Sequence, residues 1–504
     1  MNRVDAHRLL ELVLDPSSFV SWDESPVDPA GDPAYTEELT RAREKTGINE
    51  AVITGSGSID GHQVAMIASE FAFLGGSIGV ASAERIVRAI EHATAARLPL
   101  VAMPSSGGTR MQEGTLAFAC MIKIAAAVTQ HKTARLPYIV YLRHPTTGGV
   151  FASWGSLGHV TYAEPEALLG FLGPRVYEAL HDRPWPRDVQ TSENLYRHGV
   201  VDAVVAHEQL RRTLAATLAV LRADSDAAPP PSRRTQPAIP PSYSAWETVI
   251  RSRRVGRPSA RTVLARAATS IVELSGSGRG ERDTGLLLAL AKLAGQPCVL
   301  SAHDRHTQST HGPIGPAALR TANRGMQLAA ELGLPLVTVI DTAGAALSKE
   351  AEEGGLAGEI ARGIATLVTL PTPTLCLLLG QGCGGGALAQ LPVDRVIAAQ
   401  HAWIAPLPPE GASAIMHRSV EHAAEVATAH GVRAADLLEN GIVDRIVPER
   451  PDATDEPDTF CRRISSALHL ELTALLSTDP DDRLKLRVER YRRLGRPAVV
   501  DRGR

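Results

Sequence analysis

The sequence predicts an α/β protein built from two similar domains in tandem, on three observations. Short apolar runs typical of buried strands alternate with apolar residues at helical spacing along most of the chain. Landmarks of the first half return in the second half in the same order. Between the halves lies a segment with six prolines, residues 224–243, whose composition is typical of an extended linker.

The recurring landmarks share one register over most of their length. The first three pairs below have the same offset, and the last pair closes each half at a slightly larger one. Such agreement predicts a fused, diverged duplication of one domain. The pairs are Leu98–Val101 with Leu334–Val337, Pro137 with Pro373, residues 148–149 with residues 384–385, and His198–Asp202 with Asn440–Asp444.

Bulk properties limit the classes of function. At 504 residues the chain is long enough for two domains with separate cores, and 44% hydrophobic residues indicate that most of it folds. A formal net charge of -3 argues against an extended nucleic-acid surface, so a small molecule or another protein is the expected partner. Five scattered cysteines without a Cys-x-x-Cys pair support neither a zinc ribbon nor a disulfide framework.

The same composition predicts a protein of the reducing cytoplasm. The N-terminus carries charged residues within its apolar stretch, unlike a signal peptide. We find no apolar run of the ~18 residues that a membrane span needs, so no membrane partner is expected.

The elements of the first half follow in order. A short helix at residues 5–13 precedes a polar, proline-containing stretch that reaches Tyr35. Two alternating strands follow, separated by glycine turns at Gly55, Gly57 and Gly61. The expected elements are strands at 51–54, 63–68, 98–103 and 138–142, and helices at 81–96 and from 114 to about 130.

Two glycine turns are the candidate centres of chemistry. Each follows a buried strand, Tyr138–Leu142 or Thr374–Leu379, and ends in paired glycines that open a helix. Because glycine has no Cβ, a ligand can approach the backbone N–H groups there, which can hold an oxyanion at a helix N-terminus. The alternative is that these glycines only permit close packing of strand against helix.

Specific motifs of both halves resemble one enzyme family. Phe73–Gly79 (FLGGSIG), Ser105–Gly114 (SSGGTRMQEG) and Pro145–Val150 (PTTGGV) resemble the β subunit of bacterial acetyl-CoA carboxylase carboxyltransferase. Val339–Gly344 (VIDTAG) and Gly380–Ala389 (GQGCGGGALA) resemble its α subunit. Further α-like positions are Ala245–Trp246, Arg257–Pro258, Glu352–Glu353 and Pro409–Ile415.

The resemblance covers residues 45–210 and 245–450 and implies a β-α fusion of two crotonase-type domains. Each is expected to be a ββα-repeat spiral of the ClpP/crotonase-like superfamily. The predicted division is an N-terminal arm at 1–44, an N-terminal carboxyltransferase domain for acyl-CoA at 45–223, a proline-rich linker at 224–243, a C-terminal carboxyltransferase domain for biotin at 244–475, and a basic C-terminal helix and tail at 476–504.

The implied reaction moves the carboxyl group of carboxybiotin to the α-carbon of acetyl-CoA or propionyl-CoA, giving malonyl-CoA or methylmalonyl-CoA for lipid synthesis. Gly148 and Gly149 would hold the thioester oxygen as the enolate forms. Gly385, Gly386 and Ala387 would hold the ureido oxygen of biotin. The implied substrate-binding residues are Gly75, Gly76, Ser106, Gly107, Gly108, Arg110, Thr147, Ala343, Gly344 and Ala389.

The resemblance also implies the partners. Biotin would sit on a separate carrier protein, carboxylated by a separate biotin carboxylase. In this family the active site lies between the N-half of one protomer and the C-half of another, so a homodimer or hexamer is expected. No metal is expected on this chain.

For most of the other residues considered for catalysis or metal binding, the sequence favours a structural role. Arg110 and Glu113 read as a structural pair, and His144 reads as a hydrogen-bonded structural residue. Glu352 and Glu353 read as caps of the helix that follows. The histidines at positions 303, 306 and 311 lack matching ligands for a metal site. The arginine-rich tail reads either as a contact for CoA phosphates or as a helix docked on its domain.

Two other functions stay open. One is decarboxylation of malonyl thioesters on the same fold, which biotin dependence would distinguish. The other is a non-catalytic assembly subunit, which the glycines retained in both turns disfavour. The sequence also departs from the family pattern in two places. The N-terminal zinc ribbon of the β subunit is absent, and the loop Ser301–Gly312 is rich in His and Thr where the α subunit is more basic.

Overall fold

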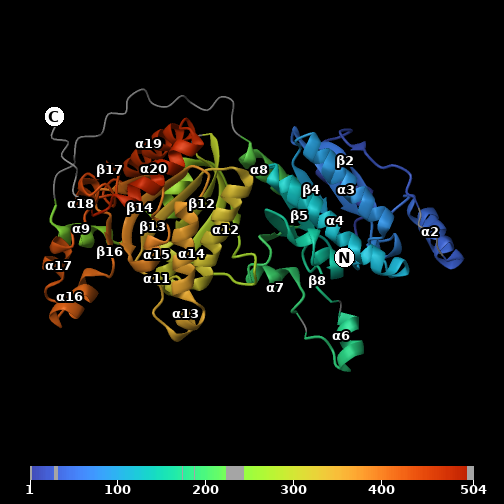
Figure 1. The fold of residues 1–504 in the computed structure, drawn as a ribbon, viewed down its shortest axis with the longest axis horizontal. Helices are drawn as coiled ribbons and strands as arrows, with labels where there is room; N and C mark the ends of the chain where they lie inside the picture. The colour runs from blue at the N-terminus through green and yellow to red at the C-terminus, as the bar shows by residue number, and fades with distance from the viewer. Residues whose placement is uncertain are drawn as a thin grey trace. The chain divides into compact units, whose positions relative to one another are not determined.

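The computed structural model describes residues 3–27, 32–172, 174–186, 188–222, 243–293 and 295–495. The chain forms two compact units, one of residues 1–219 with 278–281 and one of residues 220–277 with 282–504 (Figure 1). The predicted linker at 224–243 lies outside the described residues except for Tyr243, and so does the end of the tail from residue 496. The domain boundaries proposed from the sequence therefore stay a prediction.

The first unit is a seven-stranded sheet in the order β1-β2-β3-β4-β5-β7-β9. Its β2 and β3 form an antiparallel hairpin, and the strands from β3 to β9 run parallel. A small second sheet pairs β6 with β8. The strands are β1 Val20–Ser21, β2 Val52–Ile59, β3 His62–Ser69, β4 Leu100–Met103, β5 Tyr138–Leu142, β6 Thr146–Thr147, β7 Val160–Ala163, β8 Leu169–Gly170 and β9 Ala203–Val204.

The helices of the first unit connect these strands, and α8 continues two residues past the point where the units divide. They are α1 Ala6–Val13, α2 Pro33–Thr46, α3 Val80–Ala95, α4 Gly114–Thr133, α5 Gly148–Phe151, α6 Pro174–His181, α7 Ser192–Arg197 and α8 His207–Leu221, with short 3-10 turns at Leu74–Gly76, Met111–Glu113 and Trp154–Ser156.

The second unit repeats this topology. Its sheet has the order β10-β11-β12-β13-β14-β15-β17, with β16 beside the end of β14. An antiparallel pair, β11 and β12, again precedes a parallel run. The strands are β10 Ala268–Leu274, β11 Leu286–Leu293, β12 Gln296–His303, β13 Leu336–Thr342, β14 Thr374–Cys383, β15 Arg395–Ala399, β16 Trp403–Ala405 and β17 Arg445–Val447.

The predicted duplication is thereby confirmed at the level of topology. The strands that end at the two glycine turns, β5 and β14, occupy the same place in their sheets. The helices of the second unit are α9 Ala245–Ser252, α10 Ala260–Ala267, α11 Arg305–His311, α12 Pro316–Leu332, α13 Lys349–Glu353, α14 Leu356–Val368, α15 Gly384–Leu388, α16 Pro409–His417, α17 Ala423–Ala429, α18 Ala434–Glu439, α19 Pro457–Leu476 and α20 Pro480–Arg492.

Two expectations near the N-terminus are wrong. Gly55 and Gly57 lie inside β2 and not in a turn. A Cβ on Gly55 would lie 2.3 Å from the carbonyl oxygen of Val20, so glycine here lets the preceding segment pack onto the strand. The polar stretch before residue 45 contains helix α2, which Asp32 caps and which ends at Gly47 in the left-handed conformation.

Helix α4 packs beside α3 over the first sheet (Figure 1). Its buried face, with Ala117, Ile124 and Val128, belongs to the same core cluster as α3. By length and composition alone, Met111–Thr133 passes as a membrane span, contrary to the expectation from the sequence, and a third of its most apolar window is buried in the structure. A helix that packs in a protein core passes the same test. The buried face of α4 packs into the core of the first unit in this way.

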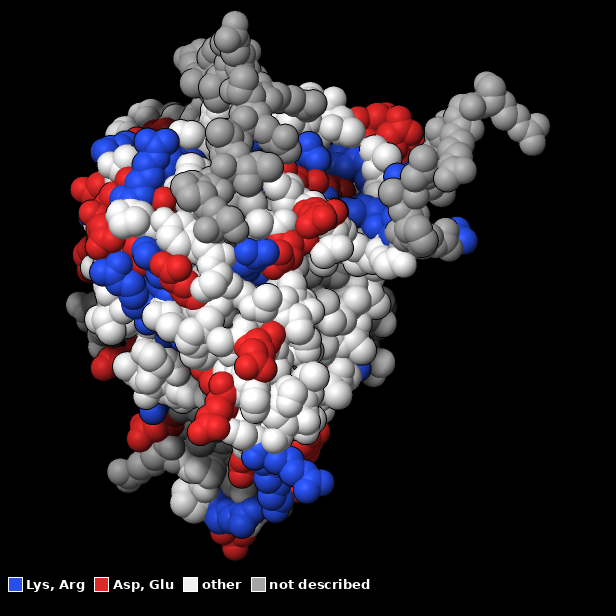
Figure 2. Space-filling view, turned by 90° about the vertical axis from the view of Figure 1, so that its left-hand side faces the viewer, with Lys and Arg blue, Asp and Glu red and all other residues white. Residues whose placement is uncertain are grey.

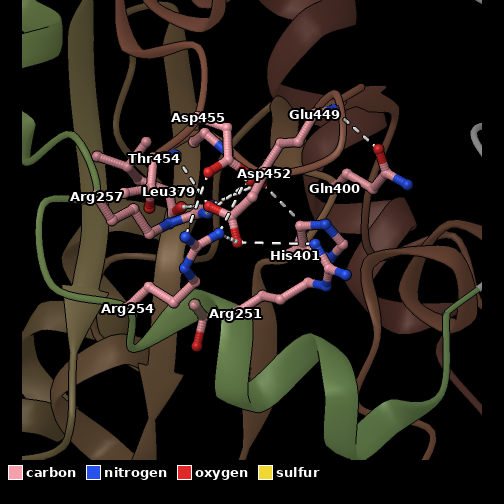
Figure 3. A network of polar contacts seen from close by, with 12 residues as sticks. Arg251, Arg254, Arg257, Leu379, Gln400, His401, Glu449, Asp452, Thr454 and Asp455 are labelled. Carbon is pink, nitrogen blue, oxygen red and sulfur yellow. Dashed lines mark hydrogen bonds and ion pairs between the residues drawn. The ribbon is translucent and has the colours of Figure 1, made fainter.

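A buried polar network holds the second unit together around Arg257 (Figure 3). The Arg257 guanidinium donates to both carboxylate oxygens of Glu449, at 2.6 and 2.7 Å, and to the carbonyl oxygen of Leu379. Glu449 also accepts from the backbone of His401 and Ala453. The network ties the α9–α10 connection to the loop after β17 and to the strand that carries the second glycine turn.

Removing Arg257 should strongly destabilise the second unit. Burial alone raises the pKa of the Glu449 carboxyl, but the charge and hydrogen bonds of Arg257 outweigh it and hold that pKa below its usual value. Arg257→Met leaves the carboxylate buried and unpaired, so we expect the free energy of unfolding at pH 7 to fall by about 3–5 kcal/mol.

The pair contributes stability above the pKa of Glu449 in the unfolded chain and loses it as the pH falls through the folded pKa. Denaturant unfolding should therefore show the gap between wild type and Arg257→Met closing below about pH 4.5. Arg41→Met breaks an exposed ion pair with Glu37 and should leave stability unchanged. Equal losses in the two variants would contradict this role.

Candidate active site

Three glycine-containing loops of the first unit meet backbone to backbone. The N–H of Gly107 donates to the carbonyl oxygen of Gly75 at 2.9 Å. The N–H of Thr147 donates to the carbonyl oxygen of Ser106, also at 2.9 Å. The structure therefore brings together the FLGGSIG, SSGGTR and PTTGGV motifs, which the sequence alone showed only as separate segments.

Glycine is required where these loops touch. A Cβ on Gly76 would lie 2.1 Å from the carbonyl oxygen of Ser105. A Cβ on Gly108 would lie 3.4 Å from Cα of Gly148, and both residues have positive φ, 114° and 63°. The close packing that the sequence left as an alternative role for the glycines is present here.

The free amides of the first turn lie one residue later than predicted. The N–H of Gly148 donates to the carbonyl oxygen of Phe171 at 2.9 Å, so it is not available to a ligand. The N–H groups of Gly149 and Val150, in the first turn of α5, have no acceptor in the part of the chain that the structure describes. We name Gly149 and Val150 the first cradle.

The second unit repeats the loop geometry with different side chains. The N–H of Gly344 donates to the hydroxyl of Thr342 at 3.2 Å, as the N–H of Gly108 donates to the hydroxyl of Ser106 at 3.0 Å. Gly344 has φ of 131°, like its counterpart in the left-handed region. The loop after β13 is thus shaped by the same hydroxyl-to-amide turn as the loop after β4 in the first unit.

Helix α15 presents the second set of amides. Gly384 takes φ of 65°, and the N–H groups of Gly385 and Gly386, the second and third residues of the helix, have no acceptor among the described residues. Ala387 is the fourth helical residue, where the N–H forms the first helix bond to the carbonyl of the N-cap residue Cys383, so its amide is not available to a ligand. A Cβ on Gly385 would lie 2.6 Å from Cδ1 of Ile360, and one on Gly386 would lie 2.9 Å from Cδ1 of Ile314, so glycine is required at both positions. We name Gly385 and Gly386 the second cradle.

Arg110 supports the first cradle from inside the unit. Its side chain is fully buried and its guanidinium donates to Glu50, Tyr35, Glu113 and the carbonyl of Ser77. Burial raises the pKa of Tyr35, so the phenol stays protonated and bonded to Glu113. Arg110 therefore anchors the loop through protein contacts, which supports the structural reading over direct contact with a substrate.

The remaining predicted residues fall into two groups. Gly75, Gly107 and Ala343 lie at least partly exposed on the loops beside the cradles. Ser106, Thr147 and Ala389 are buried. Ala389 packs against Leu319, Ala351 and Leu356 just past the second cradle, in a cluster of small and aliphatic side chains.

The side chains outside the cradles have structural roles. Nδ1 of His144 accepts the N–H of Leu168 at 3.1 Å, as the structural reading expects. Glu352 and Glu353 are exposed in α13 and do not cap α14, which begins after Gly355 without a side-chain cap. Among the residues that the structure describes, no three His, Cys, Asp or Glu side chains are placed to share a metal.

Sequence reasoning missed a buried carboxylate beneath the second cradle. Asp341 ends β13 fully buried, and its Oδ1 accepts the N–H of Gln381 at 3.1 Å. A Cβ on Gly380 would lie 2.4 Å from that oxygen, and burial raises the pKa of the Asp341 carboxyl. At the equivalent place in the first unit, Ser105 donates to the carbonyl of His144. The constant offset between the two halves could have pointed to this residue, because it places Asp341 at the position that Ser105 has in the first half.

A methyl group on Gly380 should disturb the second cradle through Asp341. Because both groups are buried, we expect Gly380→Ala to lower the free energy of unfolding by about 1–3 kcal/mol through overpacking, and to reduce activity. Shortening the acid restores space, so Gly380→Ala with Asp341→Ser should cost less than the sum of the single changes.

Denaturant unfolding of the four proteins in this cycle gives the coupling. Gly411→Ala is the control, because a Cβ there would meet its nearest neighbour, Cδ of Pro408, only at 3.9 Å. Strict additivity of the two substitutions would show that the oxygen does not limit residue 380.

Comparison with known proteins gives independent evidence on the function of this site. The model of the carboxyl transferase domain family matches residues 7–483. A Mycobacterium tuberculosis protein named "Probable biotin-dependent acyl-coenzyme A carboxylase beta3 subunit" is 58% identical over 497 residues, covering 99% of this chain and 100% of the relative. The acetyl-coenzyme A carboxylase carboxyl transferase subunits beta/alpha of Salinispora arenicola are 39% identical, covering 98% of this chain and 91% of the relative.

Solved structures share the fold. A transcarboxylase 12S structure with methylmalonyl-coenzyme A and methylmalonic acid bound has a TM-score of 0.74 at 21% identity, covering 94% of this chain and 90% of that one. A single-chain, multi-domain long-chain acyl-CoA carboxylase has a TM-score of 0.68 at 21% identity, covering 91% of this chain and 46% of that one. These likenesses support the predicted crotonase-type fold in both halves.

Proposed function

This chain belongs to the carboxyl transferase domain family, and from that premise we propose how its two cradles divide the work of a biotin-dependent acyl-CoA carboxylase. The protein is a carboxyltransferase that acts on acyl-CoA. One observation carries the proposal: in the part of the chain that the structure describes, each half has backbone amides without an acceptor at the start of a short helix that opens with glycines.

The first cradle holds the acyl-CoA. The N–H groups of Gly149 and Val150 bind the thioester oxygen and stabilise the negative charge that develops there when the α-proton leaves. Each such donor contributes roughly 2.7–4 kcal/mol to transition-state stabilisation. The loops with Gly75, Gly107 and Thr147 form the wall beside this oxygen, and Arg110 holds them in place from behind.

The second cradle holds the ureido oxygen of biotin. Carboxybiotin, carried by another protein, supplies the carboxyl group and a ureido oxygen that becomes negative as the group leaves. The N–H groups of Gly385 and Gly386 fit that oxygen because nothing else in the described chain accepts from them. Asp341 keeps the turn before them in shape by binding the N–H of Gln381.

The chain contributes charge stabilisation and positioning. Amides at a helix N-terminus are fixed before the reaction, so they need no reorganisation when charge develops. Holding both reactants in order contributes a further ~7–11 kcal/mol at most. A side-chain base is not required by this scheme, which agrees with the structural roles of His144 and Arg110.

The acyl group is short in our proposal. Ala389, the small residue that the sequence suggested beside the acyl group, is buried among small and aliphatic side chains and does not by itself set the length of that group. The similar transcarboxylase 12S structure has methylmalonyl-coenzyme A bound. We therefore propose acetyl-CoA or propionyl-CoA as substrate and malonyl-CoA or methylmalonyl-CoA as product, for lipid synthesis.

A homo-oligomer, dimer or hexamer, would bring the cradles of two copies together. Leu116, Phe118 and Ile122 of α4 are exposed, from 63 to 74%, next to the first cradle's helix. The second unit exposes Ile415 and Met416 on α16, and Figure 2 shows a broad uncharged area across this side of the unit. Such apolar surface is typical of an interface.

The other partners in our proposal are a biotin carboxylase and a biotin carrier protein, in the cytoplasm. All five cysteines are free and buried, as a reducing compartment would allow. The malonyl-thioester decarboxylase and the non-catalytic assembly subunit remain the competing proposals for this fold. The open second cradle favours transfer over both, because neither needs amides for a ureido oxygen.

The reverse reaction tests the proposal. Purified protein with malonyl-CoA or methylmalonyl-CoA should lose the carboxyl group only when free biotin or biocytin is added, because the second cradle needs an acceptor. The loss can be followed by chromatography of the CoA esters, and the ratio of the two rates gives the acyl preference. Loss without biotin would favour the decarboxylase. No loss from a folded protein that binds CoA esters, even with its carrier, would favour an assembly role.

A further inference from the structure

We propose that the second unit has an anion site for a phosphoryl group, in a cavity of about 380 Å³ between α19, α20 and the start of β15. It belongs to neither cradle and is independent of the carboxyl transfer proposed above. Its charged and polar lining consists of Asp394, Arg395, Thr478, Arg483, Arg487 and Arg490. The volume lies within the range of about 300–1,000 Å³ that small-molecule sites occupy.

Positive charge is in excess around the cavity. Asp394 pairs with Arg487 and more distantly with Arg483, and Asp444 pairs with Arg395 and Arg490. One further carboxylate, that of Glu471, serves both Arg395 and Arg445. Asp479, which caps α20, also interacts with Arg483. Four carboxylates thus face five guanidinium groups, which leaves one positive charge over.

Two buried guanidinium donors lack an acceptor. Nε of Arg483 and Nε of Arg490 have no hydrogen-bond partner in the described structure. The Arg483 side chain is 6% exposed, and its nearest carboxylate oxygen, on Asp394, is 3.7 Å away. That oxygen already accepts from Arg487 and from the backbone and hydroxyl of Thr374. Buried donors of this kind need a partner, and an anion in the cavity would supply one.

A purely structural role accounts for only part of the cluster. Arg487 donates to the carbonyl oxygens of Leu367, Leu370 and Thr372, and so holds the end of α14. Arg483 donates to the carbonyl of Pro371. These bonds confirm that α20 docks on its domain. They leave the Nε of Arg483 without an acceptor among the described residues.

Guanidinium groups select the chemistry of the ligand. Their fork of N–H donors matches the oxygens of phosphate, and several in one site favour a dianion over chloride. The group is either inorganic phosphate or the phosphoryl end of a larger molecule. Burial, with a smaller contribution from the charge of Arg487, lowers the pKa of Arg483, and the carboxylates of Asp394 and Asp479 offset this only in part.

The test is binding of inorganic phosphate and pyrophosphate to the full-length protein, by titration calorimetry in Tris chloride at constant ionic strength. We expect saturable binding at one site per chain. Arg395→Gln should weaken it about tenfold or more, because it removes an exposed guanidinium without touching the α14 contacts. Arg483→Gln should weaken it at least as much, and circular dichroism will show whether that variant is folded.

The matched control is Arg492→Gln, which removes an exposed arginine from α20 outside the cavity and should leave binding unchanged. Tighter binding of pyrophosphate than of phosphate would support the site and indicate a larger phosphorylated molecule as its ligand. Tighter binding of phosphate would support the site and indicate inorganic phosphate as its ligand. No saturable binding to the wild type would overturn the proposal. Equal weakening by Arg395→Gln and Arg492→Gln would also overturn it, since it would reflect net charge alone.

Discussion

Close approach of backbone to backbone is the constraint on which this structure depends. In each half, glycines let neighbouring groups lie against the turn that opens a short helix: the backbone of two loops in the first half, and the side chains of Ile314 and Ile360 in the second. Among the described residues, that turn leaves amide N–H groups without acceptors. A Cβ on Gly76 would strike the carbonyl of Ser105, and one on Gly386 would reach Ile314. The sheets, the flanking helices and the buried ion pairs all serve to hold these turns. In our proposal the chemistry uses these backbone amides and needs no catalytic side chain, so the two halves could diverge in side chains while keeping the site.

The divergence is visible in how each turn is supported. In the first unit Arg110 anchors the loop with several hydrogen bonds to buried acids and a tyrosine. Ser105 there donates to the carbonyl of His144, the residue that corresponds to Gly380 in the second unit. In the second unit Asp341 takes the place of the serine and requires glycine at residue 380. One geometry is therefore built from two sets of contacts, which fits a duplication whose halves bind different partners.

Much of the fold could be predicted from the sequence, because strands such as 138–142 are short apolar runs ended by glycine, and because the halves share one register. The glycines of β2 were wrongly predicted as turn residues. A glycine that lets a neighbouring segment pack onto a strand cannot be told from a turn glycine when that segment is unknown. The free amides were placed one residue early, because the bond from Gly148 to Phe171 joins distant parts of the chain. For the same reason the sequence could not decide whether the arginines of α20 dock on the domain: their partners, such as Asp394, are far away in the sequence.

The central claim is that a cradle from each half, on two copies of the chain, makes one active site. Complementation between defective copies tests it most directly. Gly149→Val and Gly386→Val each block one cradle, so each homo-oligomer should be inactive. Mixing the two after unfolding and refolding should restore about a quarter of wild-type carboxyl transfer, because half of random dimers are hybrids and each hybrid has one site with both cradles intact. No activity in a mixture that demonstrably contains hybrids would contradict the account.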